Sequence, residues 1–333
     1  LREKLILAGP KEERDRLLVQ QHQRHAACFE STALGLAIAP TLRCNFRCPY
    51  CFQSSQKDGK SMTPDTRERL VDWLKSYKGI NRLSVSWYGG EPLLDFKAIC
   101  ELTEKLLELE VAYDHADLIT NGYLLDREKI SRLNDLKITS IQITLDGPRE
   151  VHDSRRFLAG GGPTFERILE NVSNLMSSDY AGSCNIRINV DRDNIQNYLQ
   201  LREKLLEQFK GTRLQVYPGH VNAAQNHVYN RELCLDMDEW SDFNLEMYYR
   251  HFVPPRGGLH PPGHTRGICI ANRHNGFVVG PEGELYKCLS DVGKDAMVLG
   301  NLNVHDPITD PLLLARYVTG MDAYNDPDRK STR

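Results

Sequence analysis

The sequence predicts an α/β protein whose core is a partial (β/α)6 TIM-type barrel. Short apolar runs rich in β-branched residues alternate with longer amphipathic stretches, a pattern typical of parallel strands joined by crossover helices. Glycine-containing polar motifs follow several of these runs, at the strand ends where complete barrels carry their functional groups. A length of 333 residues also suffices for one such core and a smaller appendage.

The elements are expected in the following order. Residues 1–33 are charged and mostly helical in character, so we expect a leader or docking segment there. Strands are then predicted at residues 34–39, 82–88, 116–120, 140–145, 185–190 and 213–217. A helix is predicted over residues 64–77, because Thr63 can cap it and Pro64 suits its first turn.

The pattern changes after residue 253. The sequence becomes rich in Pro, Gly and His, and a short hairpin is predicted around residues 280–283. We therefore expect the barrel to occupy residues 34–253 and a small C-terminal region to occupy residues 254–333.

Composition and charge narrow the class of protein. Hydrophobic residues make up 40% and charged residues 26%, as in ordinary globular proteins. The net charge of −3 gives no reason to expect a nucleic acid or an anionic membrane as partner. No apolar run approaches the roughly 20 residues that span a bilayer, and no secretory signal is found. Nine cysteines, three of them crowded together, suit a metal site in a reducing, cytoplasmic compartment better than a disulfide framework.

The crowded cysteines directly follow the first predicted strand. Residues 44–51 read CNFRCPYC and bring Cys44, Cys48 and Cys51 onto one loop. Three thiolates can hold three irons of a cubane and leave the fourth iron open to an outside ligand. A zinc loop is the alternative. Zinc would need a fourth Cys or His, and none lies between Cys51 and His115.

This loop resembles the CxxxCxxC motif of the radical S-adenosylmethionine superfamily, in which an aromatic residue, here Tyr50, precedes the last cysteine. The resemblance implies a [4Fe–4S] cluster whose open iron is chelated by S-adenosylmethionine. It also implies that electron transfer into the sulfonium releases a 5′-deoxyadenosyl radical. In such systems the protein positions the cofactor and excludes water, while the cofactor carries the difficult chemistry.

A glycine-rich turn follows the second predicted strand. Residues 87–92 read WYGGEP, and two glycines allow a close backbone approach that other residues do not. A plain strand-to-helix turn would explain the same residues. The resemblance makes this the family's GGEP element, which implies that Gly89, Gly90 and Glu91 meet the ammonium group of S-adenosylmethionine.

Polar residues also end the third, fourth and fifth predicted strands. Asn121 and Asp146 each precede a glycine, so either could be only a turn former. The resemblance implies that they contact the ribose and carboxylate of S-adenosylmethionine, with Asn189 as a further candidate. His152, Asp153 and Arg156 resemble the HDxxR stretch of sulfatase maturases and peptide maturases. Arg156 could clamp a carboxylate with its planar guanidinium, or be an exposed structural arginine.

Two cysteines stand in the C-terminal region. Cys269 and Cys288, with Gly283 between them, resemble the opening half of the SPASM domain, which implies an auxiliary iron–sulfur cluster in a SPASM/twitch-like module. Two thiolates cannot complete such a site, and no cysteine follows Cys288. Cys234 and His264 are conceivable supplements. The chain begins at Leu1 and lacks the further cysteines, which is compatible with truncation at both ends.

The expected function follows from the resemblance. We expect radical maturation of a ribosomally made (RiPP) precursor peptide or a protein, forming a thioether or a carbon–carbon crosslink, with a reducing partner such as flavodoxin or ferredoxin. The alternatives are an anaerobic sulfatase maturase that makes formylglycine, a small-molecule radical enzyme, and a non-catalytic iron–sulfur electron carrier. The carrier explains the cysteines but not Glu91 and its glycines.

Overall fold

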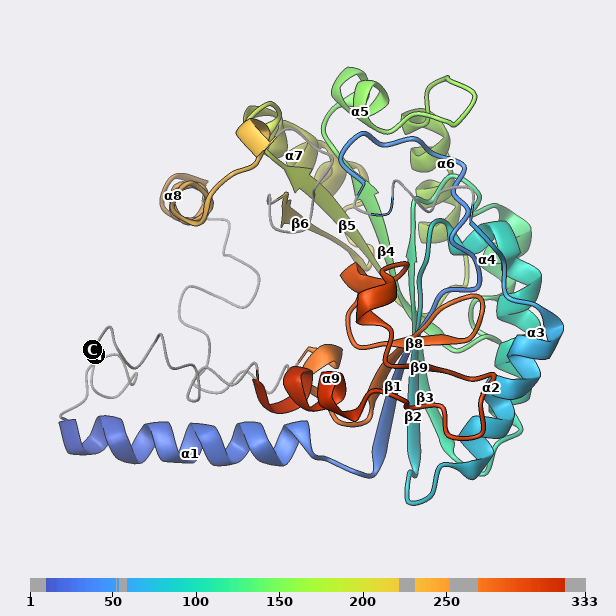
Figure 1. Ribbon diagram of the computed structural model, residues 1–333. Helices are drawn as coiled ribbons and strands as arrows, with labels where there is room; N and C mark the ends of the chain where they lie inside the picture. The colour runs from blue at the N-terminus through green and yellow to red at the C-terminus, as the bar shows by residue number, and fades with distance from the viewer. Residues whose placement is uncertain (1–9, 52, 54–58, 222–230, 252–268, 321–333) are drawn as a thin grey trace.

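The computed structural model describes residues 10–51, 53, 59–221, 231–251 and 269–320. Its centre is a nine-stranded sheet in the order β6-β5-β4-β3-β2-β1-β7-β8-β9 (Figure 1). The first six strands all pair in parallel, which confirms the six predicted β/α units. They are β1 (Ala33–Ile38), β2 (Arg82–Trp87), β3 (Ala112–Thr120), β4 (Ile138–Leu145), β5 (Ser183–Val190) and β6 (Leu214–His220).

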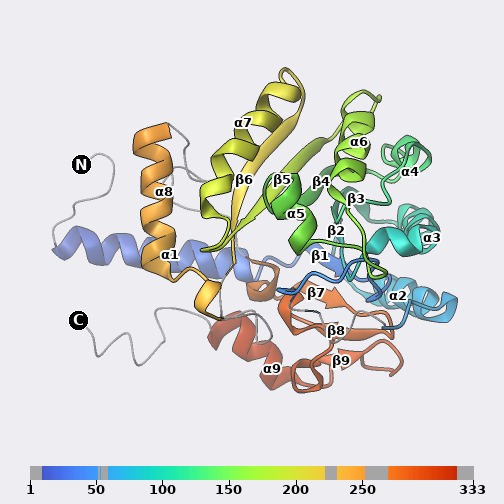
Figure 2. The ribbon, with the colours of Figure 1, turned by 90° about the horizontal axis from the view of Figure 1, so that it is seen from above.

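Helices cover one side of the curved sheet, as Figure 2 shows from above. They are α2 (Pro64–Ser76), α3 (Phe96–Leu107), α4 (Arg127–Arg132), α6 (Phe165–Met176) and α7 (Tyr198–Gln208). The helix predicted after Thr63 is confirmed: the Thr63 side chain accepts a hydrogen bond from the Thr66 amide at 3.1 Å, and Leu70 and Leu74 are buried. An amphipathic stripe of this kind fixes a helix against a sheet by apolar burial.

The remaining helices flank this core. The N-terminal segment forms α1 (Pro10–Cys28), which extends away from the sheet in both views and confirms its predicted helical character. The others are α5 (Arg149–Arg155), α8 (Met237–His251) and α9 (Pro311–Ala315). No helix among the described residues has the length and apolar character to cross a bilayer.

Four strands, β3 to β6, are longer than predicted, and β3 and β6 differ most. β3 begins at Ala112, not Ala116; no apolar run marks residues 112–115, because they are exposed or partly exposed and extend past the apolar core. β6 runs on to His220, through Pro218 and Gly219, which are poor strand formers in sequence terms. Their pairing with β5 decides the structure there.

The C-terminal residues extend the same sheet. β7 (Gly276–Val279) pairs in parallel with β1, and β8 (Glu284–Tyr286) and β9 (Gly300–Asn301) follow as antiparallel strands. The predicted hairpin at residues 280–283 is confirmed, with Gly283 at a φ of 84°. The predicted boundary at residue 253 falls within 252–268, outside the described residues, and remains a prediction.

Candidate cofactor site

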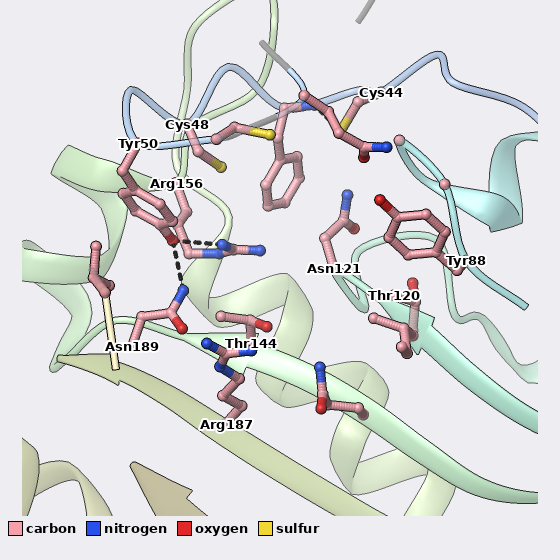
Figure 3. A pocket seen from close by; sticks show the side chains of 18 of the residues that line it. Cys44, Cys48, Tyr50, Tyr88, Thr120, Asn121, Thr144, Arg156, Arg187 and Asn189 are labelled. Carbon is pink, nitrogen blue, oxygen red and sulfur yellow. Dashed lines mark hydrogen bonds between the residues drawn. The ribbon is translucent and has the colours of Figure 1, made fainter. Parts of the chain in front are cut away.

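A cavity of about 220 Å³ lies at the carboxyl ends of the parallel strands, beneath the cysteine loop (Figure 3). It combines three thiols with polar side chains from β3, β4 and β5. The predicted site residues that line it are Cys44, Cys48, Cys51, Tyr50, Gly89, Gly90, Asn121, Arg156 and Asn189. Residues far apart in the sequence thus meet at one place, as expected for parallel strands that end at a common edge.

The Gly89–Gly90 turn packs against the cysteine loop. A Cβ atom on Gly89 would lie 2.3 Å from the Thr41 carbonyl oxygen, and one on Gly90 would lie 2.3 Å from the carbonyl oxygens of Leu42 and Arg43. The Gly90 amide donates to the Thr41 carbonyl at 3.1 Å. The two glycines therefore allow this turn to approach the loop that carries the thiols.

Glu91 locks this turn to the end of β3. Its side chain is completely buried, and its carboxylate accepts hydrogen bonds from Thr120 Oγ1 at 2.6 Å, the Asn121 amide at 2.7 Å and the Leu93 amide at 3.1 Å. Burial raises the pKa of the Glu91 carboxyl, against the opposing effect of these hydrogen bonds. Glu91 does not line the cavity. The structure places it behind the wall that Gly89, Gly90 and Asn121 form.

The Tyr50 hydroxyl joins three other predicted site residues. It donates to Asp146 Oδ1 at 2.9 Å and accepts from Arg156 at 2.6 Å and from Asn189 Nδ2 at 3.2 Å. Figure 3 shows the last two bonds as dashed lines. Complete burial raises the pKa of Tyr50 far above its usual range, so the hydroxyl keeps its proton. The cysteine loop is thereby tied to the ends of β4 and β5.

Asp146 lies behind this network and does not line the cavity. One carboxylate oxygen accepts from Tyr50, and the other accepts from Arg155 Nε at 3.0 Å. Arg155 also pairs with Asp191 at 2.6 Å. The sequence reading missed Arg155 and Asp191, because nothing in their local pattern distinguishes them from surface charges. Buried charges must be paired in this way to be tolerated.

The HDxxR stretch supports the same wall. His152 is fully buried, and its Nδ1 accepts from the Asp146 amide at 3.3 Å. Burial lowers the pKa of His152 well below its usual range, which keeps the ring neutral. Asp153 accepts from the amides of Thr164 and Phe165 at 2.8 and 2.9 Å and so caps the start of α6. Of the three, only Arg156 reaches the cavity.

The chemistry of the lining fits an iron–sulfur cluster with a polar ligand beside it. Burial raises the pKa of the Cys44 thiol to about 12, because it disfavours the thiolate. Ligation to iron would stabilise the thiolate, since the metal replaces the proton on sulfur. Four buried polar atoms of the lining make no hydrogen bond within the described structure: Gln53 Nε2, Arg156 Nε, Arg187 Nε and Asn189 Oδ1. Such atoms are costly unless a ligand satisfies them. Within the described ranges, no three His, Cys, Asp or Glu side chains converge on a point where one metal ion would sit.

The C-terminal cysteines form a second, separate group. Cys269 is exposed and Cys288 half-buried; burial raises the pKa of Cys288, and Cys269 lies near enough to add a small electrostatic contribution. Cys28 lies with Cys269 near Lys287, whose pKa is lowered to about 7 by burial. Cys234 lies instead near Arg192, at the β5 side of the sheet. His264 falls outside the described residues.

A parallel partial barrel with a three-thiol loop over a polar cavity defines a class of cofactor-dependent, iron–sulfur-binding enzymes. The family model described as "Radical SAM superfamily" matches residues 38–205, half of the chain. The chain belongs to the radical SAM superfamily. This family binds a [4Fe–4S] cluster and S-adenosylmethionine, and membership excludes the zinc-loop alternative.

Individual relatives cover less of the chain. A cysteine-type anaerobic sulfatase-maturating enzyme of Clostridium perfringens is 30% identical over 148 residues, 40% of this chain and 39% of that enzyme. A PqqA peptide cyclase of Bradyrhizobium diazoefficiens is 31% identical over 132 residues, 39% of this chain and 33% of that enzyme. The matches thus span about a third to two fifths of these curated relatives.

Solved structures match more of the fold. The structure titled "Native anSMEcpe with bound AdoMet and Kp18Cys peptide" has a TM-score of 0.65 at 22% identity and covers 86% of this chain and 81% of its own. Streptococcus suis SuiB bound to precursor peptide SuiA has a TM-score of 0.59 at 16% identity, covering 98% and 72%. At these identities the likeness establishes the partial-barrel fold.

Proposed function

We propose that this protein is a radical SAM enzyme that acts on a peptide or protein substrate. When bound, the cluster and S-adenosylmethionine would supply the 5′-deoxyadenosyl radical that abstracts hydrogen from a substrate side chain. The observation that carries the proposal is the meeting of the three thiols, the Gly89–Gly90 turn and the Tyr50 network around one cavity.

The residues of this chain have distinct tasks in the proposal. Cys44, Cys48 and Cys51 would hold the cluster. The guanidinium of Arg156, held by Tyr50 and buried, would pair with the carboxylate of S-adenosylmethionine. The backbone of Gly89 and Gly90 would face its ammonium, positioned by Glu91 from behind. Asn121 and Asn189 would hydrogen-bond to the remaining polar groups of S-adenosylmethionine.

The substrate class rests on the relatives. The PqqA cyclase is named for a peptide, and the SuiB structure contains a precursor peptide. We therefore favour maturation of a ribosomally made (RiPP) peptide by a thioether or carbon–carbon crosslink, in the cytoplasm, with a flavodoxin or ferredoxin as reductant. Cys269 and Cys288 would contribute to an auxiliary cluster in the complete SPASM-type protein.

The second candidate is anaerobic sulfatase maturation, in which a Cys or Ser becomes formylglycine. One observation favours it: the Clostridium perfringens sulfatase-maturating enzyme matches at 30% identity. Both candidates require the same cofactor site, and they differ in the peptide that is accepted.

A single experiment tests the shared cofactor chemistry. The protein is reconstituted anaerobically with iron and sulfide, reduced with dithionite and incubated with S-adenosylmethionine, and 5′-deoxyadenosine is quantified. Cys48→Ala should abolish the product, because the cluster loses a ligand. Cys100→Ala is the control, since Cys100 lies on α3, away from the cavity. Equal product from wild type and Cys48→Ala would refute the proposal.

A further inference from the structure

The floor of the cavity is a polar surface, of which, among the described residues, only Asn189 is hydrogen-bonded to the cysteine loop, through Tyr50. Thr144 on β4 and Arg187 and Asn189 on β5 face it, since alternate residues of a strand share one face. Figure 3 shows Arg156 under the cysteine loop and Arg187 on the strands below, beside Thr144. The cavity therefore has two arginines at two different levels.

Arg187 is an unpaired cation with a space built for it. Its Nε is buried and makes no hydrogen bond, and none of the ion pairs in the described ranges includes it. On the neighbouring strand, Gly219 pairs with Asn189, and a Cβ there would lie 2.1 Å from Arg187 Nε. The missing side chain at position 219 is what leaves room for the guanidinium to lie against β6.

The positive charge of Arg187 lies on the floor of the cavity, at the opposite end from Cys44 and Cys48 (Figure 3). Arg156 and Arg187 both line the cavity, whereas no Asp or Glu does so among the described residues. The nearby acids Glu91 and Asp146 are turned away and already accept hydrogen bonds from other groups. An arginine keeps its proton, so the buried and unpartnered Nε–H of Arg187 calls for an acceptor, and an anion is the strongest one.

The cofactor supplies only one such partner. S-adenosylmethionine carries a single carboxylate, and Arg156, which lies nearer the cysteine loop, would be the partner of that carboxylate (Figure 3). Arg187 is left with no anion from the protein or from the cofactor. The remaining occupant of the cavity is the substrate.

We propose that Arg187 binds the carboxylate of an Asp or Glu side chain in the peptide substrate. Its planar guanidinium can grip a carboxylate through two parallel hydrogen bonds, which fixes direction as well as charge. The contact would hold the acidic residue on the floor of the cavity, close to the side chain that is modified. The proposal rests on the proposed function for the peptide class and adds a specificity rule to it.

The test incubates a pool of random nine-residue peptides anaerobically with the reconstituted protein and S-adenosylmethionine, and the peptides that bind are recovered and sequenced. Wild type should enrich Asp or Glu at one position by about tenfold over Asn or Gln, as a charge-assisted contact predicts. Arg187→Gln should lose this preference, and Arg187→Glu should exchange it for Lys or Arg. Gly219→Ala should weaken it, because the added methyl displaces the guanidinium without removing its charge.

Arg132→Gln is the matched control, since Arg132 is a partly exposed arginine on α4, away from the cavity. It should keep the acidic preference. Absence of acidic enrichment in wild type, or its survival in both Arg187 variants, would overturn the proposal. So would a loss of S-adenosylmethionine binding in Arg187→Gln, which would assign Arg187 to the cofactor. Peptide binding is read without turnover, so failure of the 5′-deoxyadenosine assay would refute the proposed function separately.

Discussion

The two cysteine-bearing regions of the molecule differ in how firmly the fold holds them. Cys44, Cys48 and Cys51 lie on a loop that Gly90 and Tyr50 attach to three strand ends. Cys269, in contrast, is exposed, whereas Cys288 is half-buried, as Cys44 and Cys51 are. Tyr88 links the regions, because it lines the cavity while its hydroxyl donates to the Leu289 carbonyl at 3.0 Å.

The difference shows what makes a ligand set functional. Tyr50 joins the loop of the N-terminal thiols to the ends of β4 and β5 around the cavity, whereas the buried hydrogen bond of Tyr317 to Asp291, near Cys288, lies within the C-terminal region. Metal-binding side chains hold a metal well when hydrogen bonds from surrounding residues fix their orientation. We therefore expect the N-terminal cysteines to hold their cluster without any contribution from Cys269 or Cys288.

The largest effect is expected from breaking the scaffold at Gly90. In Gly90→Ala the new methyl would meet two backbone carbonyls at 2.3 Å, so the turn must move away from the cysteine loop. We expect the free energy of unfolding to fall by about 1–3 kcal/mol. Formation of 5′-deoxyadenosine should fall about a hundredfold, as for other small misplacements of a reacting group.

Urea unfolding and the product assay measure these two effects. Gly160→Ala is the control, because nothing lies within 4 Å of its added methyl. A Gly90→Ala protein as stable and active as Gly160→Ala would show that the turn does not brace the loop.

A smaller effect is expected at Glu91. Glu91→Gln replaces a carboxylate oxygen that accepts a hydrogen bond with an amide group that cannot, in a fully buried position. We expect S-adenosylmethionine to bind roughly tenfold more weakly. The free energy of unfolding should also fall, by about 1–3 kcal/mol, in the absence of any cofactor.

This second measurement separates two roles of Glu91. Weaker binding with unchanged stability would favour the direct contact with the ammonium group that the sequence predicts. Weaker binding with lower stability would favour the positioning role that the geometry indicates. Glu104→Gln, an exposed substitution on α3, controls for the loss of charge.

Much of this arrangement could be predicted from the sequence. The strand ends at residues 120, 145 and 190 coincide with the predicted ones, because apolar runs followed by polar turns mark them clearly. The cysteine loop, Tyr50, Arg156 and Asn189 were expected at one site and lie there.

The rest depends on contacts between distant residues. The residues next to Asp146 and Glu91 in the sequence do not indicate that their carboxylates turn away from the cavity. The groups that hydrogen-bond to these carboxylates, Tyr50 for Asp146 and Asn121 for Glu91, are distant in the sequence. Arg187 looks like one polar residue in an alternating strand, and Gly219, which makes room for it, lies on the next strand. The pairing of β7 with β1 joins residues about 240 positions apart, beyond the reach of any local pattern.

The comparison between the two cysteine regions is tested most directly by electron paramagnetic resonance of the reduced, reconstituted protein, with and without S-adenosylmethionine. The double variant Cys269→Ala/Cys288→Ala should keep the signal of a reduced [4Fe–4S] cluster and the change in that signal when S-adenosylmethionine is added. If the wild-type protein holds an auxiliary cluster, this variant should bind less iron per chain than wild type. Cys48→Ala should lose both the signal and the response. A signal that responds to S-adenosylmethionine in Cys48→Ala but vanishes in the double variant would contradict the account.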